Sequence, residues 1–273
     1  MKLLLAYFSA TGNTAQIAGI IKTSLVALGA EVDELDITSY ADRRESVDLT
    51  PYQAVIFGAP IHSNRAPRIV RDWLNTLNGE GRKCATFFTY GGFGVHPTHY
   101  STRTILEARN FVLVASAEFL GKHTFNLAGW SAMTTRPDEA DFEVAREFAE
   151  KIYPRFTGED PGLVGPLEKT NRTDKELDEF EKFRFKAVQQ LPTRNGAECS
   201  MCLICEDLCP THAMDAQQGA ADPERCIVCL RCLANCPEGV LHVNDLRELW
   251  QFKLQGENET AESLNQKKSR IYL

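Results

Sequence analysis

Eight of the nine cysteines lie between Cys199 and Cys236, where they form two copies of one pattern. Each copy reads C-x2-C-x2-C-x3-C-P, and the second copy begins 27 residues after the first. Three cysteines at this spacing place their thiolates around one corner of a metal–sulfide cube, and the fourth ligand must come from elsewhere in the chain. The repeat therefore predicts two iron–sulfur sites in a small segment whose halves fold together.

Disulfides and zinc are the alternative uses of these cysteines. The opening apolar run LLLAYF stops after six residues at the polar SATGNT, without a small-residue cleavage site, so we do not expect a secretion signal. Clustered cysteines without such a signal more often bind metal than form disulfides. Zinc sites use two C-x2-C pairs per metal and leave no third C-x2-C step or trailing Cys-Pro, so the spacing favours iron–sulfur.

Residues 196 to about 244 resemble bacterial-type ferredoxins that carry two [4Fe–4S] clusters. All eight motif cysteines and both prolines are present, and the departures are the spacer between the copies and a long C-terminal extension. In such ferredoxins the fourth cysteine of each run ligates the other cluster. The resemblance thus implies cluster A on Cys199, Cys202, Cys205 and Cys236, and cluster B on Cys226, Cys229, Cys232 and Cys209.

The first 156 residues alternate short apolar runs with segments of helical spacing. Strands are predicted at residues 2–8, 31–37, 53–60, 84–90 and 111–120, and helices at 14–29, 66–77, 98–109 and 138–153. Residues 39–52 are too polar for an assignment beyond a short helix or a loop. This alternation predicts an α/β fold, a doubly wound, five-stranded parallel sheet covered by helices on both faces.

A phosphate site is predicted where the first strand meets the first helix, in SATGNT. The hydroxyls of Ser9, Thr11 and Thr14 and the backbone N–H groups of a helix N-terminus would converge on an anion, and Gly12 permits the close turn. The loop has neither the lysine of G-x-x-x-x-G-K-[ST] nor the pattern G-x-G-x-x-G. A terminal monophosphate suits this neutral loop.

Two later loops carry what a flat aromatic ring needs. They follow the third and fourth strands, and the carboxyl ends of parallel strands line one crevice. Glycines in the second of these loops let the backbone approach the edge of the ring. We expect Tyr90 or Phe93 to stack on the face of the ring while the other packs in the core. Polar groups of the first loop are expected to meet the heteroatoms of the ring.

These three loops resemble those of the flavodoxin family, from the S-x-T-G-N-T phosphate loop to the glycine-rich turn. The resemblance covers residues 1 to about 156 and implies FMN, although flavodoxins are acidic and this half has a net charge of only −1. The implied FMN-binding residues are Ser9, Thr11, Gly12, Asn13, Thr14, Pro60, Ile61, His62, Ser63, Asn64, Thr89, Tyr90, Gly91, Gly92, Phe93 and Gly94.

The expected organisation has four parts. A flavodoxin-like FMN domain (1–156) is followed by a linker (157–193) that begins with a stretch rich in Gly and Pro. The linker also contains a helix at 173–191, which begins with a Thr173–Glu176 capping box. We expect this helix to dock the two halves together, with a solvated linker helix as the alternative. A small α+β ferredoxin domain (194–245) and a C-terminal extension (246–273) of no assigned role complete the chain. A short strand and then a helix are expected in residues 240–255.

Several other residues are candidates for a role at the flavin. His62 is a weak candidate for a catalytic proton donor, with His96 and His99 also near the expected crevice. Trp130 lies in the long loop 122–137, and three roles are open for it: it covers the flavin, it contacts the ferredoxin half, or it packs as an ordinary core side chain. Arg65, Arg68 and Arg71 form either a solvated helix face or a surface that receives acidic groups of the ferredoxin half. Cys84 is expected to be a small buried side chain.

The whole sequence resembles flavodoxin–ferredoxin fusions, which implies a cytoplasmic iron–sulfur flavoprotein that passes electrons between FMN, two [4Fe–4S] clusters and a redox partner. An FMN-dependent reductase of a small molecule, fed through the clusters, is the second hypothesis, and a redox sensor or assembly module is the third. Neither half has the basic stripe of a nucleic-acid-binding protein. No apolar run approaches the roughly 18 residues of a membrane span, so a membrane partner is not expected.

Overall fold

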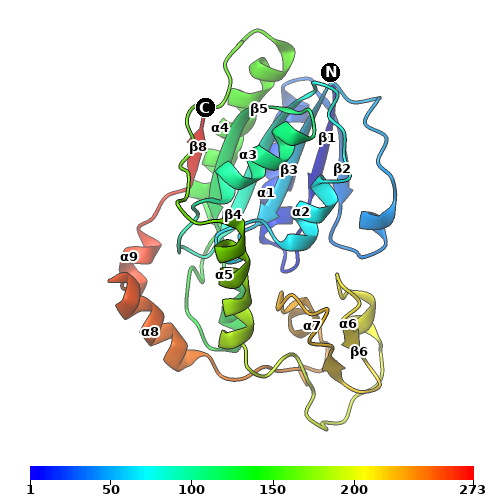
Figure 1. Ribbon diagram of the computed structural model, residues 1–273, viewed down its shortest axis with the longest axis vertical. Helices are drawn as coiled ribbons and strands as arrows, with labels where there is room; N and C mark the ends of the chain where they lie inside the picture. The colour runs from blue at the N-terminus through cyan, green and yellow to red at the C-terminus, as the bar shows by residue number, and fades with distance from the viewer.

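A six-stranded sheet forms the centre of the protein (Figure 1). This computed structural model describes the backbone of residues 1–273 and the side chains of all residues except 183–186. The strand order is β2-β1-β3-β4-β5-β8, and the five strands β1 to β5 are parallel neighbours. Their bounds are Lys2–Tyr7 (β1), Glu31–Asp36 (β2), Ala54–Pro60 (β3), Lys83–Tyr90 (β4) and Val112–Leu120 (β5). The parallel α/β fold predicted from the alternation is confirmed.

The sixth strand corrects the prediction of a five-stranded sheet. β8 (Arg270–Tyr272) comes from the C-terminal extension and pairs antiparallel with the edge strand β5. The hydroxyl of Tyr272 donates a hydrogen bond of 2.9 Å to Glu118 on β5. Three residues are too few to show a strand pattern, and their pairing partner lies some 150 residues earlier in the chain.

Helices cover both faces of the sheet. α1 (Asn13–Ala27) and α4 (Glu139–Thr157) pack on one face through side chains such as Ile21 and Phe148. α2 (Arg68–Leu74) and α3 (Thr98–Ala108) cover the other face through side chains such as Trp73 and Leu106. Residues 39–52 contain one short 3-10 helix, η1 (Asp42–Arg44), and a second, η2 (Thr124–Ala128), follows β5. The three strand-to-helix loops of the predicted site, which follow β1, β3 and β4, therefore open at the carboxyl edge of the sheet.

The remaining elements lie below this edge in Figure 1. α5 (Asp174–Ala187) leads to the cysteine-rich segment, residues 194–245, which holds α6 (Ile204–Asp207), the strand pair β6 (Met214–Asp215) and β7 (Ala220–Ala221), and α7 (Arg231–Ala234). α8 (Arg247–Glu257) and α9 (Ala261–Asn265) then return the chain to the sheet. The short strand predicted before α8 is a single bridge between His242 and Thr193.

The tail approaches the sheet through a buried ion pair. Asp141, fully buried at the start of α4, accepts hydrogen bonds of 2.5 Å from both Nε and Nη2 of Arg136. The same carboxylate accepts one from the hydroxyl of Ser269, immediately before β8. Among the described residues, no helix is both long and apolar enough to cross a membrane.

Candidate functional site

The loop between β1 and α1 leaves hydrogen-bond donors open at a helix N-terminus. α1 begins after Gly12, whose φ of 97° is left-handed, and no side chain caps the helix. Among the described residues, nothing accepts a hydrogen bond from the backbone N–H groups of residues 11–14. Open N–H groups at the positive end of a helix are the standard arrangement for binding a phosphate.

Neighbouring hydroxyls fix the shape of this loop. The hydroxyl of Ser9 accepts a hydrogen bond of 3.0 Å from the N–H of Ala15, and the N–H of Ser9 donates to the hydroxyl of Thr38 over 2.7 Å. The hydroxyls of Thr14 and Thr89 lie 2.7 Å apart and are buried. The predicted phosphate hydroxyls of Ser9 and Thr14 therefore also hold the loop against β4 and the end of β2.

A cavity opens at this loop and collects ten of the predicted FMN residues. It is lined by Ser9, Thr11, Asn13, Thr14, Pro60, Ile61, His62, Thr89, Tyr90 and Gly91. The loop after β5 adds Lys122, His123 and Thr124, which the sequence reasoning did not single out within the long loop 122–137. His123 and Gly91 lie so close that a Cβ on Gly91 would meet the imidazole at 2.4 Å. We call this space the phosphate cavity.

A second cavity, of about 480 Å³, adjoins the first and is called here the ring cavity. The two share Ile61, Tyr90, Gly91 and His123. Of the remaining predicted residues, the ring cavity is lined by Ser63, Asn64, Phe93 and Gly94. Gly12 and Gly92 line neither cavity, although the carbonyl of Gly92 accepts a hydrogen bond of 2.8 Å from Lys267 in the C-terminal tail.

Aromatic side chains build one wall of the ring cavity. Trp130 stacks on His123 with ring centroids 4.5 Å apart, and its ring packs at 5.8 Å from Phe93 and 5.2 Å from Trp250 of α8. The indole Nε1 of Trp130 is buried and has no hydrogen-bond partner among the described residues. Phe93 thus packs in this aromatic cluster, while Tyr90 lines both cavities.

The three candidate histidines lie in different surroundings. His62 is buried and lines the phosphate cavity. His96 pairs with Glu168 at 3.1 Å, and His99 lies in the interior, 2.6 Å from the hydroxyl of Ser116. Neither His96 nor His99 lines either cavity, so of the three histidines only His62 lies at the candidate site. Cys84 is buried as expected, and burial raises the pKa of its thiol.

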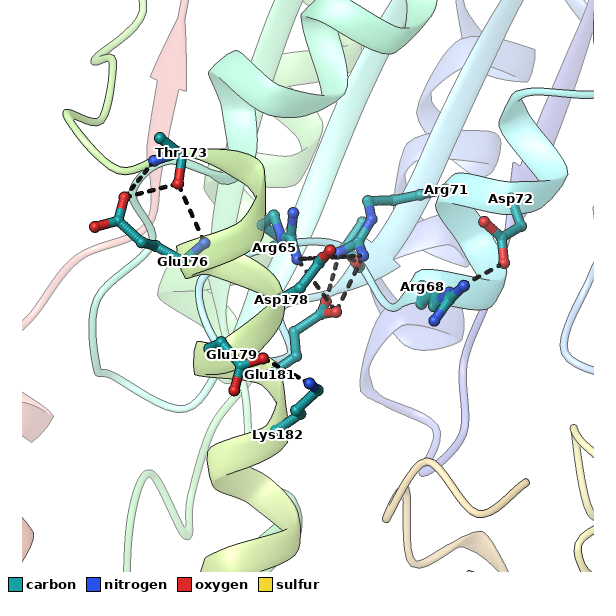
Figure 2. Close-up of polar contacts among 11 residues, drawn as sticks. Arg65, Arg68, Arg71, Asp72, Thr173, Glu176, Asp178, Glu179, Glu181 and Lys182 are labelled. Atoms are coloured by element: carbon teal, nitrogen blue, oxygen red, sulfur yellow. Dashed lines mark hydrogen bonds and ion pairs between the residues drawn. The ribbon is translucent and has the colours of Figure 1, made fainter. Parts of the chain in front are cut away.

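Two of the three arginines bind α5 instead of the cysteine-rich segment (Figure 2). Arg65, 5% exposed, contacts Asp178 at 2.5 Å and Glu181 at 3.2 Å, and Arg71 forms two contacts with Glu181. Arg68 is 78% exposed and pairs with Asp72 on its own helix. The hypothesis that the ferredoxin half supplies the acidic groups is therefore corrected. The groups that meet Arg65 and Arg71 are Asp178 and Glu181 of the linker helix α5.

This α5 clasp, formed by Arg65, Arg71, Asp178 and Glu181, has a definite dependence on pH. The hydrogen bond from Arg65 lowers the pKa of Asp178 below its ordinary value of 3.8. A carboxylate with a lowered pKa contributes its stabilisation above its unfolded pKa and loses it as the pH falls through the folded value. The Arg65–Asp178 contact is thus at full strength above about pH 4 and weakens in stronger acid.

The eight motif cysteines divide between two further cavities. One is lined by Cys199, Cys202, Cys205 and Cys236, and the other by Cys209, Cys226, Cys229 and Cys232. The other lining residues of the two cavities include Leu203, Met214, Leu230 and Leu241. Among the described side chains, no group of three or more His, Cys, Asp or Glu is arranged to hold a metal ion. A set of four sulfur donors in apolar surroundings fits the chemistry of an iron–sulfur cluster.

The second cysteine run shares apolar clusters with residues next to the two cavities. Ile227 and Cys229 belong to the apolar cluster of Phe8 and Ala10, which lie at the end of β1. Val228 and Leu230 belong to the cluster of Trp130 in the wall of the ring cavity. The chain segment around Cys226 to Cys232 therefore contributes to the same apolar clusters as Phe8 and Trp130.

Comparison with known proteins agrees with the fold of the first half. The model of the Flavodoxin domain family matches residues 4–110. The N-terminal part is a flavodoxin-like domain. The match covers the phosphate loop and the two ring loops, which carry all the predicted FMN residues.

Solved structures similar to this chain include oxidised Flavodoxin 1 and Flavodoxin 2 from Bacillus cereus. They are 21% and 24% identical, with TM-scores of 0.42 and 0.45, and the matches cover 58% and 59% of this chain and 98% and 100% of theirs. Rubredoxin oxygen:oxidoreductase from Desulfovibrio gigas is 19% identical with a TM-score of 0.44, over 57% of this chain and 36% of that one. These scores are low, and the assignment rests on the family model. No curated protein matches the sequence.

Replacing Arg71 by Gln is predicted to loosen α5. The change leaves the carboxylate of Glu181, only 17% exposed, with Arg65 alone, and we expect the opening free energy of α5 to fall by about 1–3 kcal/mol. Amide hydrogen exchange across residues 174–187 measures this directly. Arg68→Gln on the same helix is the control and is expected to change the value by less than about 0.5 kcal/mol. Equal exchange in the two variants would contradict the clasp.

Proposed function

We propose that this protein is a cytoplasmic electron-transfer iron–sulfur flavoprotein that holds one FMN and two [4Fe–4S] clusters. The observation that carries the proposal is the division of the cysteines, since each cavity collects three from one run and one from the other. The exchange of Cys209 and Cys236 is the pattern of ferredoxins with two clusters. The flavodoxin-like domain supports FMN as the second kind of cofactor.

The residues of the phosphate cavity fit FMN. The open N–H groups at the start of α1 would bind its phosphate, and the loop's lack of a lysine suits a terminal monophosphate. Tyr90 and Gly91, which line both cavities, would flank the passage of the ring into the ring cavity. There Trp130 and Phe93 line the wall.

The two cluster sites differ in their surroundings, and this difference suggests their order between the flavin and a redox partner. The site of cluster B adjoins the flavodoxin-like domain, where Cys229 and Cys232 are buried. Around the site of cluster A, Cys202 and Met201 are exposed and Leu203 is 44% exposed. We assign cluster B as the neighbour of the flavin and cluster A as the site nearest an external one-electron redox protein.

FMN supplies chemistry that exchanges two electrons and two protons, while each cluster supplies one-electron exchange. Joining both kinds of cofactor in one chain replaces a bimolecular encounter by an intramolecular one. The protein's part is to hold the cofactors in register, to exclude water through the apolar contacts of Val228 and Leu230, and to keep α5 and α8 over the ring cavity.

Anaerobically isolated protein is predicted to contain about eight irons, eight sulfides and one FMN per chain. Cys209→Ala is predicted to keep about four irons and to free Cys226, Cys229 and Cys232 for alkylation, because Cys209 belongs to the second site. Mass spectrometry after alkylation identifies the freed thiols. Cys84→Ala is the control, since Cys84 lies in the sheet, and it is expected to keep all eight irons.

Alkylation of Cys199, Cys202 and Cys205 in the Cys209→Ala variant would contradict the exchange of ligands between the runs. Zinc in place of iron would contradict the whole proposal.

A second candidate function is favoured by the size and lining of the ring cavity. Phe180 of α5 and Phe252 of α8 extend its wall beyond the three FMN loops, and Phe125 and Trp130 add further aromatic surface. Such a wall suits a flat apolar acceptor beside the flavin, such as a quinone, which takes two electrons and two protons and leaves as the hydroquinone. The buried His62 is the candidate proton donor.

This reductase hypothesis predicts saturable turnover of a water-soluble naphthoquinone. Phe180→Ala removes part of the wall and is expected to raise KM about fivefold with the FMN content unchanged. His62→Ala is expected to lower kcat. Turnover that rises linearly with quinone and is the same in both variants would leave simple electron transfer as the function.

A further inference from the structure

Arg231 joins the cysteine-rich segment to the phosphate loop. It lies between Cys229 and Cys232 in the second cysteine run, at the first position of α7. Its Nη1 donates hydrogen bonds of 2.9 Å to the carbonyl of Ser9 and 3.1 Å to the carbonyl of Ala10. One guanidinium therefore connects the loop that carries three cluster B ligands with the loop at the N-terminus of α1.

The geometry of the peptide bond gives this contact a consequence for anion binding. In a trans peptide unit the carbonyl and the N–H point in opposite directions, so a cation on the carbonyls of Ser9 and Ala10 directs the N–H groups of Ala10 and Thr11 to the other side of the loop. A cation on a carbonyl also polarises its peptide unit and strengthens the N–H as a donor. Arg231 thus sets the direction and the strength of donors at the phosphate cavity.

The other end of the guanidinium has no acceptor. The Nε of Arg231 is buried, and no described residue accepts a hydrogen bond from it. Leaving a buried charged donor unsatisfied is costly, so such an atom calls for an explanation. In the proposed function Cys226, Cys229 and Cys232 of this run are ligands of cluster B. Arg231 lies between the last two of them in the sequence.

We propose that Arg231 is a positioning residue shared by two cofactor sites, with Nη1 ordering the FMN phosphate loop and Nε donating to a sulfur of cluster B. The inference rests on the proposed function. A hydrogen bond to cluster sulfur from a cationic group favours the reduced, more negative cluster. Arg231 therefore tunes the potential of cluster B and the affinity for FMN through one side chain.

A second arginine supports the same junction. Arg43 donates hydrogen bonds to the carbonyls of Ile37, at 2.8 Å, and Thr38, at 2.7 Å, and also to the carbonyl of Pro210, the residue after Cys209. Thr38 in turn accepts the hydrogen bond from the N–H of Ser9. The contact of Arg231 with the phosphate loop and the contact of Arg43 with Pro210 therefore both involve a residue next to a proposed cluster B ligand. Together they hold the phosphate loop and the cluster B site in a fixed relative position.

The test compares Arg231→Gln and Arg231→Lys with Arg225→Gln, whose arginine is 55% exposed and pairs with Asp222 in the same segment. FMN and riboflavin are titrated into flavin-depleted protein that keeps its clusters, and the cluster potentials are measured by EPR-monitored redox titration. For Arg231→Gln we expect about tenfold weaker FMN binding, unchanged riboflavin binding and a lower potential for one cluster.

Arg231→Lys retains a cation for the carbonyls but has no Nε–H, so we expect FMN binding within about threefold of wild type with the potential still lowered. If Arg231→Gln does not assemble, Arg231→Lys still tests the potential. FMN affinity and potentials equal to those of Arg225→Gln would overturn the inference, as would equal losses of FMN and riboflavin. Wild-type protein without flavin or iron would instead overturn the proposed function.

Discussion

The contact between the second cysteine run and the end of β1 is the interaction on which the arrangement of the whole molecule depends. Ile227 and Cys229 belong to the same apolar cluster as Phe8 and Ala10, and Arg231 binds the carbonyls of Ser9 and Ala10 in the phosphate loop. Because this loop can bind an anion only if its N–H groups stay open, its partners must approach from the carbonyl side. The cysteine-rich segment does so, and the two candidate cofactor sites share one boundary.

Segments on either side of the cysteine-rich segment close the ring cavity. α5 is held by the two buried arginines at Asp178 and Glu181, and it contributes Phe180 to the cavity wall. On the other side α8 lines the cavity with Leu249 and Phe252, and the chain then returns to the sheet as β8. A cavity that suits a flat ring is thus built from segments far apart in the sequence.

Local patterns predicted the parts of the fold that depend on neighbouring residues. Apolar periodicity located β1 to β5 and the helices that cover them, and SATGNT indicated an open helix N-terminus. The contributions of β8, His123 and Arg231 could not be predicted, because each depends on a partner distant in the chain. The charge pattern left Arg65, Arg68 and Arg71 as either a solvated helix face or a surface for acidic groups. Only the folded chain shows that Arg65 and Arg71 meet acidic groups of α5 while Arg68 is exposed.

The central claim is that flavin and clusters exchange electrons within one chain. Rapid anaerobic mixing with a one-electron reductant, followed by absorbance of both cofactors, tests it most directly. The account predicts that flavin reduction follows cluster reduction with a first-order rate constant that stays the same when the protein is diluted about tenfold. A rate constant that falls in proportion to dilution, or flavin that remains oxidised beside reduced clusters, would contradict it.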